Sequence, residues 1–213
     1  MNLHVPGLIH RHVPAAAPTG KLLLVLHGRG DSMDGFTWLS GELELSGLDY
    51  MFVNAPDDYF GGYSWYDLPP NQAPGVLRSR KLLFGALDAL AEQGVASPDV
   101  VLFGFSQGCL MSIDVGLRYG KPLGGVCGVS GYMMFEDRAA AEVQPHAKAM
   151  PWLITHGTQD AVVPIGPTRS HVALLREAGV DVEWHEFAKG HTIEPTAEWP
   201  LIRRWMQARL AAH

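Results

Sequence analysis

Short apolar runs alternate with longer amphipathic stretches along the chain. A strand that is covered on both faces of a parallel sheet has no polar side, so its sequence is apolar throughout. Runs of this kind predict buried strands at residues 22–26, 50–54, 100–104, 123–130 and 151–157. Residues 8–13 and 180–187 predict further strands, and the first of these suits a sheet edge.

The stretches between these strands predict helices at residues 36–45, 76–93, 109–119, 168–178 and 195–210. Strands that alternate with helices are typical of an α/β fold, with a mainly parallel sheet and helices on both faces. The chain has 213 residues, and 47% of its side chains are apolar. This is enough for one well-filled core and short for two, so we expect a single domain over residues 1–213.

The strand at residues 100–104 leads directly into the sequence GFSQG, at residues 104–108, and then into a predicted helix. In this strand, turn and helix context, the pattern G-x-S-x-G predicts a nucleophile elbow that exposes Ser106 at the edge of the sheet. A serine that only caps the helix is the alternative. The choice depends on whether a base and an acid follow in the chain.

Asp160 and His191 each lie just past the end of a predicted strand, as Ser106 does. A serine hydroxyl needs a base to take its proton, and the base needs a carboxylate to fix its tautomer. The order Ser, acid, His is that of α/β-hydrolases. We therefore predict a catalytic triad of Ser106, Asp160 and His191. Other acidic and histidine residues fit less well: Asp114, Asp137, His156, His171 and His185.

The loop after the strand at residues 22–26 reads HGRGD and is rich in glycine. Backbone N–H groups in such a loop can stabilise an oxyanion, and the N-terminus of the helix after the elbow can supply a second donor. We assign these donors to the N–H groups of Arg29 and Gln107. His27, so close to the strand end, is expected to be a hydrogen-bonded loop residue.

Residues 57–75 are rich in aromatic, proline and glycine residues and show no usable period. Loops of this length are often functional. We expect Trp65 and Tyr63 to line a substrate pocket together with Met133, which follows the strand at residues 123–130. The alternative is that these side chains only anchor their loops to the core.

The formal charge of −6 argues against a surface that binds nucleic acid or anionic lipid. The N-terminal stretch has neither a cationic region nor a continuous apolar region, and no segment has the length of a membrane span. We expect a cytoplasmic protein without a membrane span, and a homodimer is left open. Cys109 and Cys127 lack the spacing of metal ligands, so we expect packing residues and no metal.

Five segments, in this order, resemble the phospholipase/carboxylesterase family of α/β-hydrolases: LHGRGD, SWYDLPPNQAPG, GFSQG, HGTQDAVVP and KGHTI. They span residues 24–193. The resemblance implies a fold without a large cap domain, hydrolysis of short-acyl esters or thioesters, and no cofactor. Arg29 resembles bacterial carboxylesterase-like members, whereas the acyl-protein thioesterases of the family have an apolar residue there.

These observations predict a serine hydrolase that cleaves small-molecule carboxylic esters of short to medium acyl chains through an acyl-enzyme. An acyl-protein or acyl-CoA thioesterase is the alternative within the class. A binding protein on a hydrolase fold, with a silent site, is the alternative outside it. The complete set of Ser106, Asp160 and His191 argues against the silent site.

Overall fold

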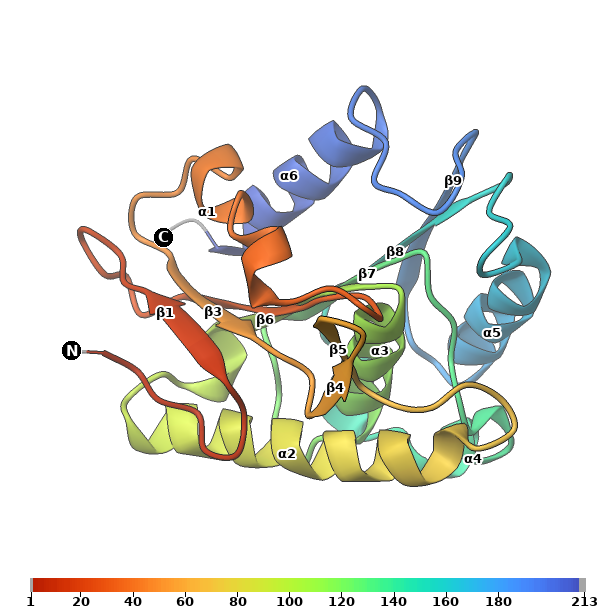
Figure 1. Ribbon diagram of the computed structural model, residues 1–213, viewed down its shortest axis with the longest axis horizontal. Coiled ribbons are helices and arrows are strands. Elements are labelled where there is room, and N and C mark those ends of the chain that lie inside the picture. The colour runs from red at the N-terminus through yellow and green to blue at the C-terminus, as the bar shows by residue number, and fades with distance from the viewer. Residues whose placement is uncertain (1, 211–213) are drawn as a thin grey trace.

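The computed structural model describes residues 2–210, which form a seven-stranded sheet covered by helices (Figure 1). The strand order is β1-β3-β2-β6-β7-β8-β9. β1 pairs antiparallel with β3, and the other neighbours in the sheet are parallel. The strands are β1 His10–Val13, β2 Leu22–Leu26, β3 Asp49–Val53, β6 Val100–Phe105, β7 Gly125–Val129, β8 Trp152–Gly157 and β9 Val182–Phe187.

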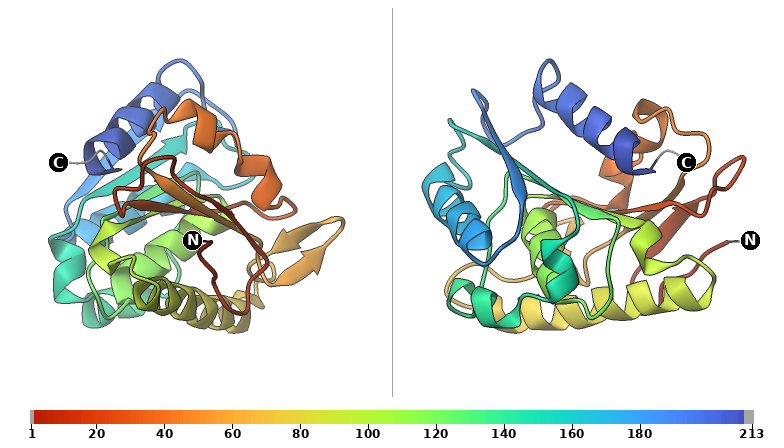
Figure 2. Two further views of the ribbon diagram at one scale, coloured as in Figure 1. Left: turned by 90° about the vertical axis from the view of Figure 1, so that its left-hand side faces the viewer. Right: turned by 180° about the vertical axis from the view of Figure 1, so that it is seen from behind.

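Helices cover both faces of the sheet, as the sequence predicts (Figures 1 and 2). One face carries α2 Gln72–Glu92, α3 Gln107–Arg118, α4 Glu136–Glu142 and α5 Ile165–Glu177. The other carries the 3-10 helix η1 Met33–Phe36, the single turn α1 Leu39–Glu42 and α6 Glu198–Leu210. Further 3-10 turns are η2 Ser97–Asp99 and η3 Pro145–Lys148.

β2 shows why the central strands are apolar throughout. Leu22, Leu24 and Leu26 pack into the core on the α2 and α3 side, whereas Leu23 and Val25 pack into the core on the α6 side. All of them are at most 1% exposed. Alternate side chains of a strand point to opposite faces, so neither face of β2 tolerates a polar residue.

The stretch at residues 57–75 is more ordered than the sequence indicates. It contains a hairpin of β4 Asp57–Tyr59 and β5 Gly62–Ser64, and α2 already begins at Gln72. The hairpin projects from the body of the molecule (Figure 2). Strands of three residues are too short to show a period, which is why the pattern did not reveal them.

Two helical stretches also differ from the prediction. The helix expected over residues 36–45 is divided into η1 and α1, and α4 was not predicted. The pattern is uninformative in both places because elements of four to seven residues span at most two helical turns. The other predicted helices and strands are present, with ends that differ by a few residues.

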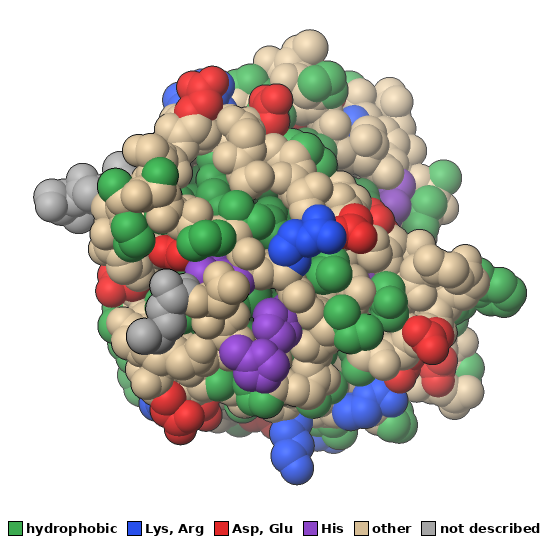
Figure 3. All heavy atoms as spheres, turned by 60° about the vertical axis from the view of Figure 1, so that its left-hand side comes forward, with side chains coloured by type: hydrophobic (Ala, Val, Ile, Leu, Met, Phe, Trp, Pro, Cys, Tyr) green, Lys and Arg blue, Asp and Glu red, His purple; other side chains and the backbone are tan. Residues whose placement is uncertain are grey.

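Within residues 2–210, no helix combines the length and apolar character needed to cross a membrane. On the face drawn in Figure 3, Lys and Arg side chains lie scattered among acidic, apolar and neutral groups. That face therefore presents no continuous basic stripe among the described residues. Cys109 and Cys127 are buried and unpaired, and they pack in the two opposite cores.

The sharp turn into α3 brings Gly108 against the end of β2. A Cβ at Gly108 would lie 2.0 Å from the carbonyl oxygen of Leu26 and 2.8 Å from that of His27. Backbone atoms cannot move aside as a flexible side chain can. We predict that Gly108→Ala lowers the free energy of unfolding by about 3 kcal/mol, measured by urea denaturation.

Gly85 provides a matched control. It lies within α2, and a Cβ there would meet nothing within 4 Å. Gly85→Ala should raise the free energy of unfolding by about 0.5 to 1 kcal/mol, because alanine is the better helix former. Equal stability of the Gly108→Ala and Gly85→Ala proteins would contradict the packing described for the turn.

Candidate active site

Ser106 lies at the turn between β6 and α3 with a strained backbone. Its φ is 55° and its ψ is −114°, a conformation that few residues other than glycine adopt. Its N–H donates to the carbonyl of Val129, at the end of β7, over 2.9 Å. A Cβ at Gly104 would lie 2.1 Å from the carbonyl oxygen of Gly108, so the chain can make this turn only with glycine there. The strand, turn and helix predicted for this sequence are therefore present.

The structure brings the three predicted triad residues into one hydrogen-bonded chain. His191 Nε2 lies 2.9 Å from Ser106 Oγ, and His191 Nδ1 lies 2.7 Å from Asp160 Oδ2. A carboxylate can only accept, so Nδ1 carries the proton and Nε2 is free to accept one from the serine. The arrangement matches a nucleophile, its base and the group that orients the base.

Asp160 is held as a carboxylate although its side chain has no access to water. Burial raises the pKa of this group, but hydrogen bonds outweigh burial, and the pKa lies below its ordinary value of 3.8. The N–H groups of Val163 and Val162 donate to Oδ1 over 2.8 and 2.9 Å, and His191 donates to Oδ2. Asp160 is therefore ionised at neutral pH and fixed in orientation.

Backbone hydrogen bonds join the loop of Asp160 to the loop of His191. The N–H of Gln159 donates to the carbonyl of Lys189 over 3.1 Å, and the N–H of Thr158 donates to the carbonyl of Phe187 over 2.8 Å. Both loops leave neighbouring parallel strands, β8 and β9, at the same edge of the sheet. The sheet thus sets the distance between Asp160 and His191.

Lys189 and Glu198 form a buried ion pair beneath the histidine loop, which sequence reasoning missed. Lys189 Nζ lies 2.5 Å from Glu198 Oε1 and also donates to Ser130 Oγ and to the carbonyl of Thr192. The other oxygen of Glu198 accepts from the N–H of Glu194 over 2.7 Å. The side chains of Lys189 and Glu198 are 2% and 0% exposed. The pair therefore fixes the backbone on either side of His191.

The two predicted oxyanion donors lie next to Ser106. Gln107 is the first residue of α3, where a helix leaves its N–H groups without partners inside the helix. Arg29 and Gln107 both border the same pocket as Ser106. The guanidinium of Arg29 stacks on the ring of Tyr59, 4.2 Å from its centroid.

The side chain of Gln107 has a second role that the sequence did not reveal. Its Oε1 accepts from the N–H of Trp65 over 2.9 Å, and its Nε2 donates to the carbonyl of Tyr66 over 2.8 Å. Ser64 Oγ approaches the same Oε1 within 3.2 Å. One amide at the elbow therefore ties down the segment that follows the β4–β5 hairpin.

A pocket of about 380 Å³ opens beside Ser106. Arg29, Ser106, Gln107 and Gln72 supply its polar border. The remaining wall consists of Tyr66, Leu68, Pro69, Tyr132, Val162, Val163, Pro164 and Pro167. It comes from three surface segments that follow β5, β7 and β8. A pocket of this size and character fits an apolar chain attached to a group at Ser106.

The three residues expected to line the pocket lie elsewhere, and this corrects the prediction. Trp65 is 0% exposed in the core, where its Nε1–H donates to the carbonyl of His27. Met133 is 2% exposed, and the backbone of Tyr63 pairs with Gly30 and Asp31. An indole N–H that finds a buried partner favours the interior. The immediate neighbours Tyr66 and Tyr132 line the pocket instead.

The competing acid and base candidates have structural partners. Asp114 binds Arg80 and Arg118 through both carboxylate oxygens. Burial lowers the pKa of His156, whose Nδ1 contacts the carbonyl oxygen of Gly157. His27 Nε2 accepts from the N–H of Ala55 over 3.0 Å, which confirms it as a hydrogen-bonded loop residue.

The buried ion pair leads to a pH-dependent prediction. Glu198→Gln leaves the Lys189 ammonium buried without its countercharge, and we expect the free energy of unfolding at pH 7 to fall by about 3 to 5 kcal/mol. Burial already lowers the pKa of Lys189, and Glu198 offsets part of this effect. Without Glu198 the folded chain binds fewer protons than the unfolded chain, so the stability difference from wild type should narrow as pH rises.

Asp34→Asn serves as the control, because Asp34 pairs with Arg11 at the surface, where the two side chains are 60% and 47% exposed. An exposed pair contributes at most about 1 kcal/mol. Urea denaturation between neutral and alkaline pH measures all three proteins. A loss in Glu198→Gln that is no larger than in Asp34→Asn, or that grows with pH, would contradict the assignment.

Known proteins resemble this chain over most of its length. The family model described as Phospholipase/Carboxylesterase matches residues 10–198. Acyl-protein thioesterase 1 of Schizosaccharomyces pombe is 31% identical over 71% of this chain and 73% of its own length. Carboxylesterase SOBER1 of Arabidopsis thaliana is 29% identical over 88% of this chain and 90% of its own length.

Solved structures agree with the sequence relatives. The crystal structure of esterase PE8 superposes with a TM-score of 0.85 at 27% identity, over 95% of this chain and 99% of that one. Residues 10–198, which the family model matches, include the seven strands of the sheet and the strand ends that carry Ser106, Asp160 and His191. The chain therefore belongs to the phospholipase/carboxylesterase family of α/β-hydrolases.

Proposed function

We propose that this protein is a serine carboxylesterase that cleaves esters of short to medium acyl chains through an acyl-enzyme. The observation that carries the proposal is the chain of hydrogen bonds from Ser106 through His191 to Asp160, at 2.9 and 2.7 Å. Family membership supports hydrolysis as the reaction class, because relatives bear the names carboxylesterase and acyl-protein thioesterase.

The reaction follows from the positions of the three side chains. Ser106 Oγ attacks the acyl carbon while its proton passes to His191 Nε2, and the carbonyl π electrons move onto the oxygen. The resulting imidazolium is stabilised by the Asp160 carboxylate. When the intermediate collapses, the bond to the leaving oxygen breaks and His191 returns the proton to it. Water then repeats the sequence on the acyl-enzyme and releases the carboxylic acid.

The backbone N–H groups of Arg29 and Gln107 stabilise the oxyanion in this scheme. Both residues border the pocket at Ser106, and Gln107 adds the positive end of the α3 dipole. Donors that are fixed before the reaction need no reorganisation, and losing one such donor elsewhere costs about 3 to 4 kcal/mol of transition-state stabilisation. The acyl chain occupies the apolar pocket beside them.

Thioester hydrolysis is the second candidate. The same nucleophile, base and oxyanion donors act on a thioester, and the Schizosaccharomyces pombe relative is named an acyl-protein thioesterase. Esters remain our first choice because of the resemblance noted for the sequence, in which Arg29 is typical of carboxylesterase-like members and an apolar residue is typical of the thioesterases. A panel of acyl-equivalent esters and thioesters separates the two.

Removal of the nucleophile tests the proposal directly. Ser106→Ala should lower kcat for a nitrophenyl ester by on the order of 10⁶ and abolish labelling by a fluorophosphonate. Ser112→Ala, on the helix that follows Ser106, removes a buried hydroxyl that has no hydrogen-bond partner among residues 2–210 and should retain both. Labelling that persists in Ser106→Ala would place the nucleophile elsewhere, and an unlabelled wild type would indicate a silent site.

The pocket assignment predicts a change in acyl-chain preference. Leu68 and Val162 line the pocket and are 55% and 69% exposed, so their truncation widens it without opening the core. In Leu68→Ala and Val162→Ala the optimum of kcat/KM should move to longer acyl chains, since one methylene contributes about 1 to 3 kcal/mol. A nitrophenyl ester series measures this optimum.

Leu174→Ala is the matched control, because Leu174 is 38% exposed on α5 and does not line the pocket. Its acyl-chain profile should equal that of wild type. If Leu68→Ala and Val162→Ala also keep the wild-type optimum, the acyl chain does not occupy this pocket.

A further inference from the structure

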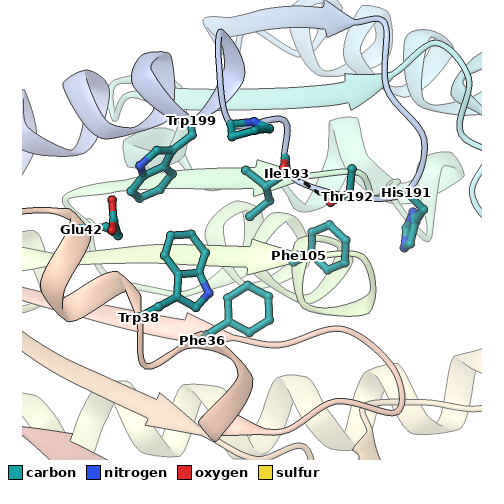
Figure 4. Close-up of a pocket in the computed structure, with 9 residues that line it drawn as sticks. Phe36, Trp38, Glu42, Phe105, His191, Thr192, Ile193 and Trp199 are labelled. Atoms are coloured by element: carbon teal, nitrogen blue, oxygen red, sulfur yellow. Dashed lines mark hydrogen bonds between the residues drawn. The ribbon is translucent and has the colours of Figure 1, made fainter.

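A separate groove of about 500 Å³ borders the triad on the His191 side (Figure 4). It lies between the η1 and α1 segment and the chain that leads into α6. The groove shares no lining residue with the pocket described above: His191 borders the groove, and Ser106 borders the pocket. The triad therefore stands between two distinct hollows.

Aromatic rings line the groove from His191 outward. Phe105 lies 5.0 Å from the imidazole and 6.1 Å from Phe36, measured between ring centroids. Trp38 and Trp199 meet edge to face at 4.9 Å. Figure 4 shows His191 at one end of the groove and the two indoles toward the other. Trp38 is 39% exposed, so residues 2–210 leave a large part of its apolar surface in contact with water.

The chemistry of the triad determines which part of an ester faces this groove. His191 Nε2 must return its proton to the leaving oxygen, so that oxygen lies on the His191 side of the acyl carbon. The carbonyl oxygen points to the donors at Arg29 and Gln107, which border the other hollow together with Ser106. The acyl chain and the leaving group thus extend into different hollows.

We propose that the groove is the leaving-group subsite and that it binds an uncharged, aromatic or similarly bulky apolar alcohol. The inference rests on the proposed esterase function and adds the alcohol half of the substrate to it. The ring of such an alcohol would pack against Phe36, Trp38 and Trp199, which together supply a preformed apolar surface.

The charge at the far end of the groove restricts the alcohol further. Glu42 lies there, opposite His191, and makes no ion pair with any residue of the described range 2–210 (Figure 4). Its carboxylate repels an anionic group that extends past the indoles. Leaving groups that carry a phosphate, whether alcohols or thiols, are therefore disfavoured. The formal charge of −6 for the whole chain acts in the same direction.

Paired acetate esters test the subsite while the acyl group stays constant. The ratio of kcat/KM for 2-phenylethyl acetate to that for ethyl acetate measures how much binding of the phenyl ring contributes. The ring is too far from the ester oxygen to change the intrinsic reactivity of the ester. We expect wild type to favour the phenylethyl ester and Trp199→Ala to lower the ratio by at least about tenfold.

Trp184→Ala is the matched control, because Trp184 is a half-buried tryptophan on β9 outside the groove. It should keep the wild-type ratio. Melting curves and fluorophosphonate labelling of Ser106 in each variant show that the fold and the nucleophile are intact.

A ratio in Trp199→Ala equal to that in Trp184→Ala, or a wild type that does not favour the phenylethyl ester, would overturn the subsite. These results leave the esterase function standing if Ser106 is labelled and ethyl acetate is hydrolysed. Failure of the function itself has a different signature, in which the wild type is neither labelled nor active on either ester.

Discussion

Lys189 Nζ and Glu198 Oε1 lie 2.5 Å apart, and both side chains have almost no access to water. Lys189 is two positions before His191, and Glu198 is in the first turn of α6. Burying two charges costs several kcal/mol per ion, and only their close contact and further hydrogen bonds offset it. Here those bonds go to Ser130 and to the backbone at Thr192 and Glu194. The loop that carries His191 is therefore fixed to α6 and to the end of β7. A loop held by backbone contacts alone would leave the imidazole freer to move.

With His191 fixed, the sheet accounts for the rest of the candidate site. Three parallel strands end at one edge and deliver serine, aspartate and histidine from positions far apart in the chain. Gln107 connects this rigid centre to the segment after the hairpin, through hydrogen bonds to Trp65 and Tyr66. The hydrogen bonds of the site thus connect the buried strands to the segment that forms part of the pocket wall.

The sequence predicts the fold and the grouping of Ser106, Asp160 and His191, because buried strands have a distinctive composition and each candidate follows a strand end. It does not predict contacts that depend on distant partners. The sequence favours a pocket position for Trp65, but its indole N–H donates a hydrogen bond to the backbone carbonyl of His27 in the core. A lysine in a loop, such as Lys189, is usually exposed, and the residues next to it in the sequence do not indicate that it pairs with Glu198. The local pattern of apolar and polar residues indicates which segments are buried, whereas these contacts depend on packing across the whole domain.

Most residues that line the two hollows are distinct from Ser106, Asp160 and His191. The walls of both hollows come mainly from segments outside the sheet, around residues 66–72, 162–167, 36–42 and 193–199, whereas Phe105 at the end of β6 also lines the groove. Side chains there can change size without removing a hydrogen bond of the central strands. Descendants of one ancestor can therefore exchange one substrate for another in small steps, each of which leaves a folded and reactive protein. On this scaffold, specificity can diverge without passing through a protein in which Ser106, Asp160 or His191 is displaced.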